Sequence, residues 1–240
     1  QEEDLFHIGY LPEERGLYPK MKVGEQAIYL ARLKGLSKAD AQQRVKEWFE
    51  RLEITSWWDK RVEELSKGMQ QKVQFVTTVV HEPRLLIFDE PFSGFDPVNA
   101  EVLKREILAL KARGTTLMLS THNMQSVEEL CDDITLINRA EVVLSGQTAE
   151  IRRAHGSHTA RVVYEGEISP TNLSRLNILE HEEREYSKIL RVQLQPEEEL
   201  RSIIAQLPST IQLQSIELEY PSMHEIFLET VQAKLIQNVV

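Results

Sequence analysis

Cysteine, excess positive charge and long apolar runs are all scarce in this chain of 240 residues, and each scarcity excludes a class of protein. A single cysteine, Cys131, allows no internal disulfide and no cysteine-based zinc site, which fits a reducing compartment. The formal net charge of −10 argues against nucleic acid as a partner, because nucleic-acid-binding domains usually present a net basic face. No apolar run approaches the roughly 20 residues that a membrane-spanning helix needs. The sequence therefore predicts a soluble chain.

The remaining composition is that of a globular protein, with 41% hydrophobic and 28% charged residues. The length suffices for one large domain, or for a large domain and a small one. Residues 6–146 alternate helical patterns with short apolar runs, which predicts an α/β fold. The apolar runs 85–88, 116–119 and 134–137 are typical of strands buried on both faces of a parallel sheet.

The character of the chain changes after residue 156. Residues 157–240 carry 7 Lys+Arg and 13 Asp+Glu, a net charge of 7 − 13 = −6. Their pattern predicts a small acidic α+β domain, separate from a larger domain over residues 1–156. Its expected elements are strands at 160–164, 189–194 and 211–218, a helix at 196–207 that has Pro196 in its first turn, and a helix from about residue 222.

Two adjacent carboxylates, Asp89 and Glu90, follow the apolar run 85–88, and Pro91 ends the strand. Acids at the C-terminal end of such a strand face the crevice where α/β sheets bind ligands. One carboxylate can hold Mg²⁺ through its water shell, and the other can activate an attacking water. The alternative is that the two acids only solvate the end of the strand.

A helix that begins after Ser66 offers a seat for phosphate. Ser66 stands as the N-cap, Lys67 adds positive charge, and Gly68 lies in the first turn. The unpaired N–H groups and the positive dipole of a helix N-terminus favour anions. By itself this pattern is more typical of an ordinary Ser-capped helix of the core.

Three further segments lie near these motifs. Residues 120–122, Ser-Thr-His, directly follow a strand, so His122 can contact a phosphate or hold a water. Residues 93–97, Ser-Gly-Phe-Asp-Pro, follow the acid pair, and residues 9–18 form a strand that runs into a polar loop. Trp57 and Trp58 are either a contact surface for a partner or the packed end of a helical subdomain.

In this order and spacing, the segments resemble the ATP-binding subunit of ABC transporters over residues 5 to about 150. Residues 65–72 resemble the signature motif, 85–89 the Walker B strand, and 93–96 the D-loop. The loop 9–18 resembles the one that couples ATP to the membrane subunits, and it carries Glu13 in place of the usual glutamine. The motif Pro-Ser-x-x-Glu-Ile-Phe at 221–227 is similar to the end of a bacterial exporter branch.

The resemblance implies a fold class and a set of partners. The fold is a P-loop NTPase-like α/β core with a helical subdomain, followed by the small α+β domain. The cofactors are ATP and Mg²⁺, and the partners are a second ATP-binding subunit, in a head-to-tail dimer, and transmembrane permease subunits. The expected location is the cytoplasm, peripheral on the inner face of the cell membrane.

The resemblance also assigns roles to single residues. It places Asp89 on magnesium, Glu90 as the catalytic base and His122 on the γ-phosphate. It places the partner's nucleotide on Ser66, Lys67 and Gly68, with Asp96 linking the two sites of the dimer and Glu13 near the metal.

One motif of the family is absent from the sequence. None of the ten glycines is followed by lysine, so the phosphate-cradling loop Gly-x-x-x-x-Gly-Lys-[Ser/Thr] does not occur. The first residue is Gln1, and in the family this loop precedes the coupling loop. We therefore expect that the chain lacks the N-terminal part of a complete subunit and is inactive by itself. The alternative function is a non-enzymatic interaction module that keeps the fold without its own nucleotide site.

Overall fold

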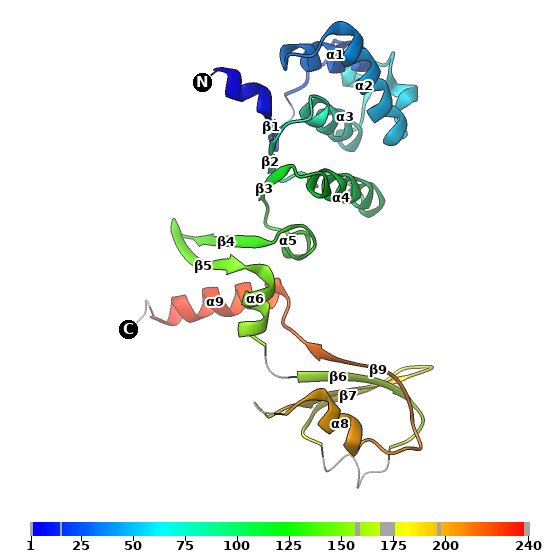
Figure 1. The fold of residues 1–240 in the computed structure, drawn as a ribbon, viewed down its shortest axis with the longest axis vertical. Helices are drawn as coiled ribbons and strands as arrows, with labels where there is room; N and C mark the ends of the chain where they lie inside the picture. The colour runs from blue at the N-terminus through cyan, green and yellow to red at the C-terminus, as the bar shows by residue number, and fades with distance from the viewer. Residues whose placement is uncertain (1, 15, 157–158, 169–175, 196–197, 238–240) are drawn as a thin grey trace. The chain divides into compact units, whose positions relative to one another are not determined.

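The structure is a computed structural model that describes residues 2–14, 16–156, 159–168, 176–195 and 198–237 (Figure 1). Contacts divide the chain into two compact units, Gln1–Asn123 and Met124–Val240. The predicted domain boundary after residue 156 falls inside the second unit and stays a prediction.

The first unit is built on a parallel sheet in the order β1-β2-β3. Its strands are β1 (Ile8–Leu11), β2 (Leu85–Asp89) and β3 (Thr116–Ser120). Leu11 pairs with Phe88, and Phe88 pairs with Leu119. The strands predicted at 85–88 and 116–119 are therefore confirmed, and so is their parallel pairing, whereas the predicted burial on both faces is wrong because alternate residues of β3 are exposed.

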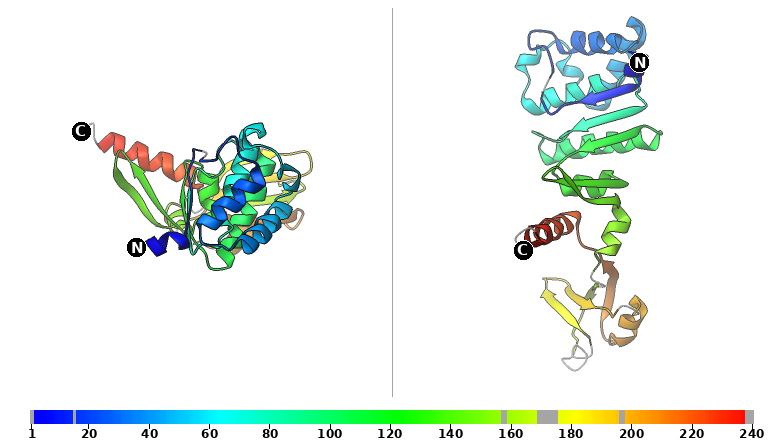
Figure 2. Two further views of the ribbon diagram at one scale, coloured as in Figure 1. Left: turned by 90° about the horizontal axis from the view of Figure 1, so that it is seen from above. Right: turned by 90° about the vertical axis from the view of Figure 1, so that its left-hand side faces the viewer.

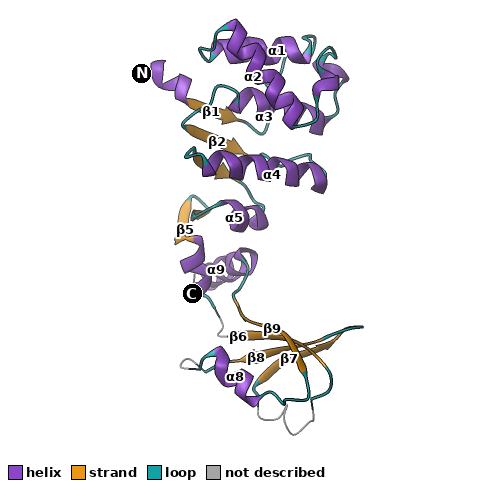
Figure 3. Cartoon of the chain, turned by 45° about the vertical axis from the view of Figure 1, so that its right-hand side comes forward, coloured by secondary structure: helices purple, strands orange, loops and turns teal. Residues whose placement is uncertain are grey.

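Helices cover one face of this sheet (Figures 1 and 3). The inward residues Leu11, Leu86 and Phe88 are fully buried, whereas Tyr10 and Met118 on the opposite face are 54% and 59% exposed. The helices are α1 (Val23–Leu33), α2 (Lys38–Arg51), α3 (Lys67–Val79) and α4 (Pro97–Ala112), with short 3₁₀ helices η1 (Glu2–His7), η2 (Thr55–Trp57) and η3 (Val62–Glu64).

Serine side chains cap the first turns of two of these helices. Ser37 accepts a hydrogen bond from the backbone of Asp40 at the start of α2, and Ser66, the predicted cap, accepts one from Met69 at the start of α3. Gly114 follows the end of α4 with a φ of +93°, a left-handed conformation that glycine adopts without steric strain.

Trp58, on the segment before α3, is packed among other side chains. The Trp58 ring packs edge-on against Phe49, with 5.3 Å between ring centroids. It also lies so close to Gly24 that a Cβ there would come within 2.5 Å of the indole. Trp58 is therefore a packing residue of the helical subdomain.

Side chains of α3 and of the segment after it contact backbone carbonyl oxygens along β1. Thr78 Oγ1 donates to Tyr10 O at 3.4 Å, and His81 Nε2 lies 3.3 Å from Ile8 O. Burial and then the nearby Lys34 ammonium lower the pKa of His81 from 6.5 to about 4, so the ring is neutral and Nε2 can donate. These bonds lock the outer edge of β1 to the helix.

The second unit begins with α5 (Met124–Leu130), a hairpin of β4 (Asp133–Asn138) and β5 (Glu141–Gln147), and α6 (Thr148–Ala154). The hairpin is antiparallel, so the prediction that residues 134–137 belong to a parallel sheet is wrong. The reason is the tight turn at Arg139 and Ala140, which have φ values of +50° and +62° and reverse the chain directly.

A four-stranded antiparallel sheet in the order β7-β8-β6-β9 follows. Its strands are β6 (Thr159–Glu165), β7 (Ile178–Glu183), β8 (Lys188–Gln193) and β9 (Gln212–Glu219). Helix α8 (Leu200–Gln206) packs Ile203 against Val162 and Leu190 on one face. The helix begins later than predicted, and Pro196 lies outside the described residues.

The last helix, α9 (Met223–Gln237), packs with α5 and β5, and Figure 2 (left) shows it running alongside the hairpin. The predicted helix from about residue 222 is thus confirmed, although it contacts elements that precede residue 156. Across the part of the chain that the structure describes, no helix is both long and apolar enough to cross a membrane.

Candidate functional site

The acid pair ends β2 beside the end of β3. Asp89 pairs in register with Ser120, and the Ser120 hydroxyl donates to Asp89 Oδ1 at 2.7 Å. This hydrogen bond orients the carboxylate at the C-terminal edge of the parallel sheet, where ligands of such sheets bind.

Glu90 has an unusual backbone conformation, with a φ of +44°. A residue with a side chain costs roughly 1–2 kcal/mol in this left-handed region. The conformation is held by a hydrogen bond from Glu90 N to Ser120 O at 2.9 Å and by the turn that follows. Strained backbone conformations are often found at functional sites, and they persist only where the surrounding structure enforces them.

The carboxylate of Glu90 binds the segment after β3 through both oxygens. Oε1 accepts the backbone N–H of His122 at 2.8 Å and lies 2.7 Å from His122 Nδ1. Oε2 accepts the hydroxyl of Thr121 at 3.0 Å. The Glu90 side chain is 19% exposed and that of His122 is 89% exposed. The structure thus brings Glu90 and His122 together at adjacent strand ends, and their catalytic roles stay predictions.

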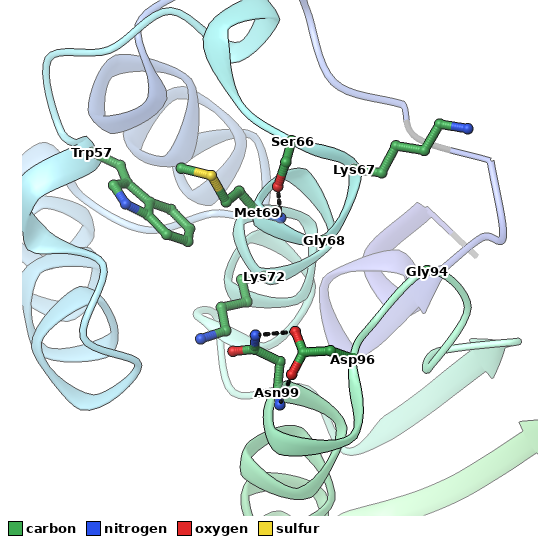
Figure 4. Close-up of a pocket in the computed structure, with 9 residues that line it drawn as sticks. All are labelled: Trp57, Ser66, Lys67, Gly68, Met69, Lys72, Gly94, Asp96 and Asn99. Carbon is green, nitrogen blue, oxygen red and sulfur yellow. Dashed lines mark hydrogen bonds between the residues drawn. The ribbon is translucent and has the colours of Figure 1, made fainter.

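A pocket of about 400 Å³ lies beside the first turn of α3 (Figure 4). Figure 4 shows the Ser66 hydroxyl turned toward the Met69 amide and the Lys67 side chain extending away from Trp57 and Asp96. The lining residues are Trp57, Ser66, Lys67, Gly68, Met69, Lys72, Gly94, Asp96 and Asn99. The three predicted phosphate-binding residues, Ser66, Lys67 and Gly68, therefore line one pocket together with Asp96.

The loop after the acid pair packs directly on this helix. A Cβ at Gly68 would lie 3.3 Å from the carbonyl oxygen of Gly94, so only a glycine fits there without a shift of the loop. Asp96 caps α4 by accepting from the amides of Val98 and Asn99. Hydrogen bonds from Asn99 hold the pKa of Asp96 below its usual range, so the cap is ionised at neutral pH.

Lys72 lines the same pocket and was missed by sequence reasoning. It lies one turn beyond Gly68 on α3, so helical spacing could have found it. Partial burial lowers the pKa of Lys72, while the Asp96 carboxylate opposes that shift. The pocket therefore contains a cation from the helix itself.

The loop after β1 is fastened to α3 through Gln74. Its amide Nε2 donates to the carbonyls of Pro12 and Glu14, each at 3.3 Å. Glu13 lies between them and is exposed. Sequence reasoning named Glu13 and missed Gln74, the residue that positions it.

The carboxylate of Asp89 can be compared with the ligands that Mg²⁺ usually takes in proteins. Among the described residues there is no group of three or more His, Cys, Asp or Glu side chains that could hold a metal. Magnesium does not need such a group, because it is usually bound by one or two carboxylates, waters and the phosphates of a substrate. A single oriented carboxylate at the end of β2 fits that coordination.

Comparisons with known proteins agree with this geometry. Residues 2–93 match the family described as "ABC transporter", and residues 146–231 match "ATP-binding protein DrrA1-3-like, C-terminal domain". The ABC transporter ATP-binding protein YhaQ of Bacillus subtilis is 44% identical over 94% of this chain and 75% of its own length. The chain belongs to the ABC transporter ATP-binding proteins. Its fold is accordingly the α/β ABC ATPase fold, as predicted.

Two other members of this family extend the comparison. The linearmycin resistance ATP-binding protein LnrL of Bacillus subtilis is 26% identical over 92% of this chain and 73% of its own length. A solved structure titled "Structure of ATP binding subunit of ABC transporter" superposes with a TM-score of 0.57 at 32% identity, and each chain is covered to 62%.

Proposed function

We propose that this chain carries the hydrolytic residues of an ATPase subunit that powers a bacterial exporter. The observation that carries the proposal is the bonding of Glu90 to His122 and Thr121, beside Asp89, at the ends of two parallel strands. A carboxylate fixed in this way can accept a proton from an attacking water. General-base catalysis of this kind typically contributes about 10²–10⁴-fold in rate.

The other residues take supporting roles at the same strand edge. Asp89 would hold Mg²⁺, which supplies charge neutralisation for the phosphates when bound. Because His122 Nδ1 is engaged with Glu90, Nε2 is the ring atom that would contact the γ-phosphate. Glu13, on the loop held by Gln74, would lie near the metal, at the place of the family's usual glutamine.

The pocket at α3 would serve a second copy or a paralogue. Ser66 and Gly68 would receive the phosphate of the partner's nucleotide at the helix N-terminus, and Lys67 and Lys72 would add positive charge. Asp96 would link the two nucleotide sites. These assignments require a head-to-tail dimer of ATP-binding subunits bound to transmembrane permease subunits, hence a location at the inner face of the cell membrane.

Export is supported by one relative and by one sequence motif. LnrL is named for linearmycin resistance, and the match to the DrrA1-3-like C-terminal domain covers the segment that contains Pro-Ser-x-x-Glu-Ile-Phe. The exporter assignment thus rests on the C-terminal region, and the proposal of ATP hydrolysis rests on the site residues.

The proposal is tested by ATP hydrolysis of the protein expressed from the start codon of its gene. Phosphate release that depends on Mg²⁺ and is lost in Glu90→Gln supports the proposal. Full hydrolysis in Glu90→Gln shows that the base lies elsewhere.

The second candidate function is an interaction module without its own nucleotide site. It is favoured by the absence of any Gly-Lys pair in the 240 residues. Both candidates predict that the 240-residue chain alone neither binds nor hydrolyses Mg²⁺-ATP, which calorimetry can check. They differ for the protein expressed from its start codon, where only the ATPase assignment predicts tight binding.

A further inference from the structure

The two oxygens of the Glu90 carboxylate are engaged to different extents. Oε1 accepts the backbone N–H of His122 at 2.8 Å and lies 2.7 Å from His122 Nδ1. A ring nitrogen that close to a carboxylate oxygen donates to it, because an ionised carboxylate has no hydrogen to give. His122 therefore directs two donors at Oε1. Since a carboxylate oxygen has about two lone-pair sites, both sites of Oε1 are filled.

The other oxygen, Oε2, keeps a lone-pair site open. Among the described residues its hydrogen-bond donor is the Thr121 hydroxyl, at 3.0 Å, which fills one of roughly two sites. The Glu90 side chain is 19% exposed, so water can approach the other site. Oε2 is therefore the oxygen that can accept a proton from water without first releasing a donor from His122.

The Thr121 hydroxyl has a defined direction. Thr121 follows Ser120, whose backbone pairs with Asp89 and whose carbonyl oxygen accepts the Glu90 N–H at 2.9 Å. Its Oγ1 accepts the backbone N–H of Asn123 at 3.1 Å, which leaves the hydroxyl hydrogen for Glu90. The branched Cβ of threonine also restricts rotation about χ1. The hydroxyl is thus fixed relative to the backbone that carries the Glu90 side chain.

We propose that Glu90 Oε2 is the atom that accepts the proton of the attacking water, and that Thr121 is the positioning residue that aims its open lone pair. This inference rests on the proposed function, in which Glu90 is the general base. An O–H bond forms at Oε2 as one O–H bond of the water breaks, and the electron pair of the broken bond stays on the water oxygen. That oxygen bonds to the γ-phosphorus, and ADP leaves with the electrons of the P–O bond. Thr121 keeps its own proton throughout.

The kinetic test uses variants of Thr121 in the protein expressed from its start codon. Thr121→Val removes the hydroxyl but keeps the branched Cβ. It should lower kcat of ATP hydrolysis by about tenfold to 100-fold with KM unchanged, because a displaced base loses rate and not substrate binding. Thr121→Ser restores the hydroxyl and should recover most of the rate. Thr116→Val is the matched control, because it makes the same substitution at the other end of β3, where Thr116 is exposed.

The positioning is also measured without catalysis, through the imidazole ring of His122. The tautomer of a histidine is set by the hydrogen bonds of its ring nitrogens, and here Nδ1 bonds Glu90. Long-range proton–nitrogen NMR of the nucleotide-free protein, at a pH where the ring is neutral, should show the Nδ1–H form in wild type and Thr121→Ser. Thr121→Val should shift the ring towards the Nε2–H form, because the carboxylate can then turn away from Nδ1. The signals are assigned by their loss in His122→Asn.

Urea unfolding shows whether each variant folds, and Thr121→Ala, which also lacks the hydroxyl, replaces Thr121→Val if that variant does not. Wild-type kcat in Thr121→Val, an equal loss in Thr116→Val, or a loss that Thr121→Ser does not recover would overturn the inference. So would a change in KM alone, or a His122 tautomer that Thr121→Val leaves unchanged. Absence of hydrolysis in the wild type would instead overturn the proposed function, and the tautomer would still decide whether Thr121 positions Glu90.

Discussion

Substituting Glu90 by glutamine separates the proton-accepting role of this side chain from its structural role. Glutamine retains one oxygen, which can accept the His122 N–H now bound by Oε1. Its amide group replaces Oε2, and the Thr121 hydroxyl can rotate to accept from it. The contacts that fix the segment 121–123 therefore survive, and the strained φ of +44° is unchanged.

The lost carboxylate should lower the hydrolysis rate by about 10²–10⁴-fold, the usual effect of removing a general base. Binding of ATP should persist, because no phosphate-binding residue has changed. A nucleotide that binds only the closed pair stabilises that pair by mass action, so the variant should accumulate as an ATP-bound dimer.

The assay is phosphate release together with size-exclusion chromatography, with and without ATP, on the protein expressed from its start codon. Thr121→Ser is a matched control, since it keeps the hydroxyl that bonds Glu90. A Glu90→Gln variant that hydrolyses ATP at near the wild-type rate would refute the reasoning and move the role of base to His122 or to another residue.

Three further predictions concern other parts of the first unit. Asp89→Asn keeps a hydrogen-bond acceptor but loses its charge, so ATP affinity should drop when Mg²⁺ is present and change little in EDTA, as titration calorimetry can measure. Gly9→Ala places a Cβ 2.5 Å from the carbonyl oxygen of Thr78 and should destabilise the chain by about 1–3 kcal/mol in urea unfolding, whereas Gly16→Ala, with open space around it, should not. Because the pKa of His81 is lowered to about 4 in the folded chain, between about pH 6.5 and pH 4 the unfolded chain binds a proton that the folded chain does not. The free energy of unfolding should therefore fall as the pH drops from about 6.5 towards 4. A His81→Leu variant whose free energy of unfolding has an unchanged slope in that window would contradict this.

The sequence predicted the parallel strands at 85–88 and 116–119 and the cap at Ser66 correctly because local signals determine them. The run 85–89 is apolar and ends in acids, and Ser66 stands before an apolar stripe of helical spacing. These signals do not depend on distant residues. The proximity of Asp89, Glu90 and His122 could also be predicted, because these residues follow two neighbouring parallel strands that end at the same edge of the sheet.

The elements that were missed depend on residues far apart or on unusual backbone conformations. Arg139 and Ala140 make a tight turn with positive φ values, although such turns usually contain Asn and Gly, so the hairpin of β4 and β5 gave no signal. Strand β7 has an acidic sequence that is typical of a solvated loop, and it is paired through Arg191 of β8, which contacts Glu180. Lys72 lines the pocket, and Gln74 contacts the loop after β1, because loops distant in sequence fold onto α3.

The outer edge of β1, whose carbonyl oxygens contact side chains, limits how this sheet can be extended. Tyr10 O and Ile8 O already receive Thr78 and His81, and Gln74 occupies the carbonyls just beyond the strand. An incoming strand would compete with these side chains for the same carbonyls, so this edge is less available for pairing than an uncovered one. For protein engineering, a strand grafted beside β1 would have to share or displace the contacts of Thr78 and His81.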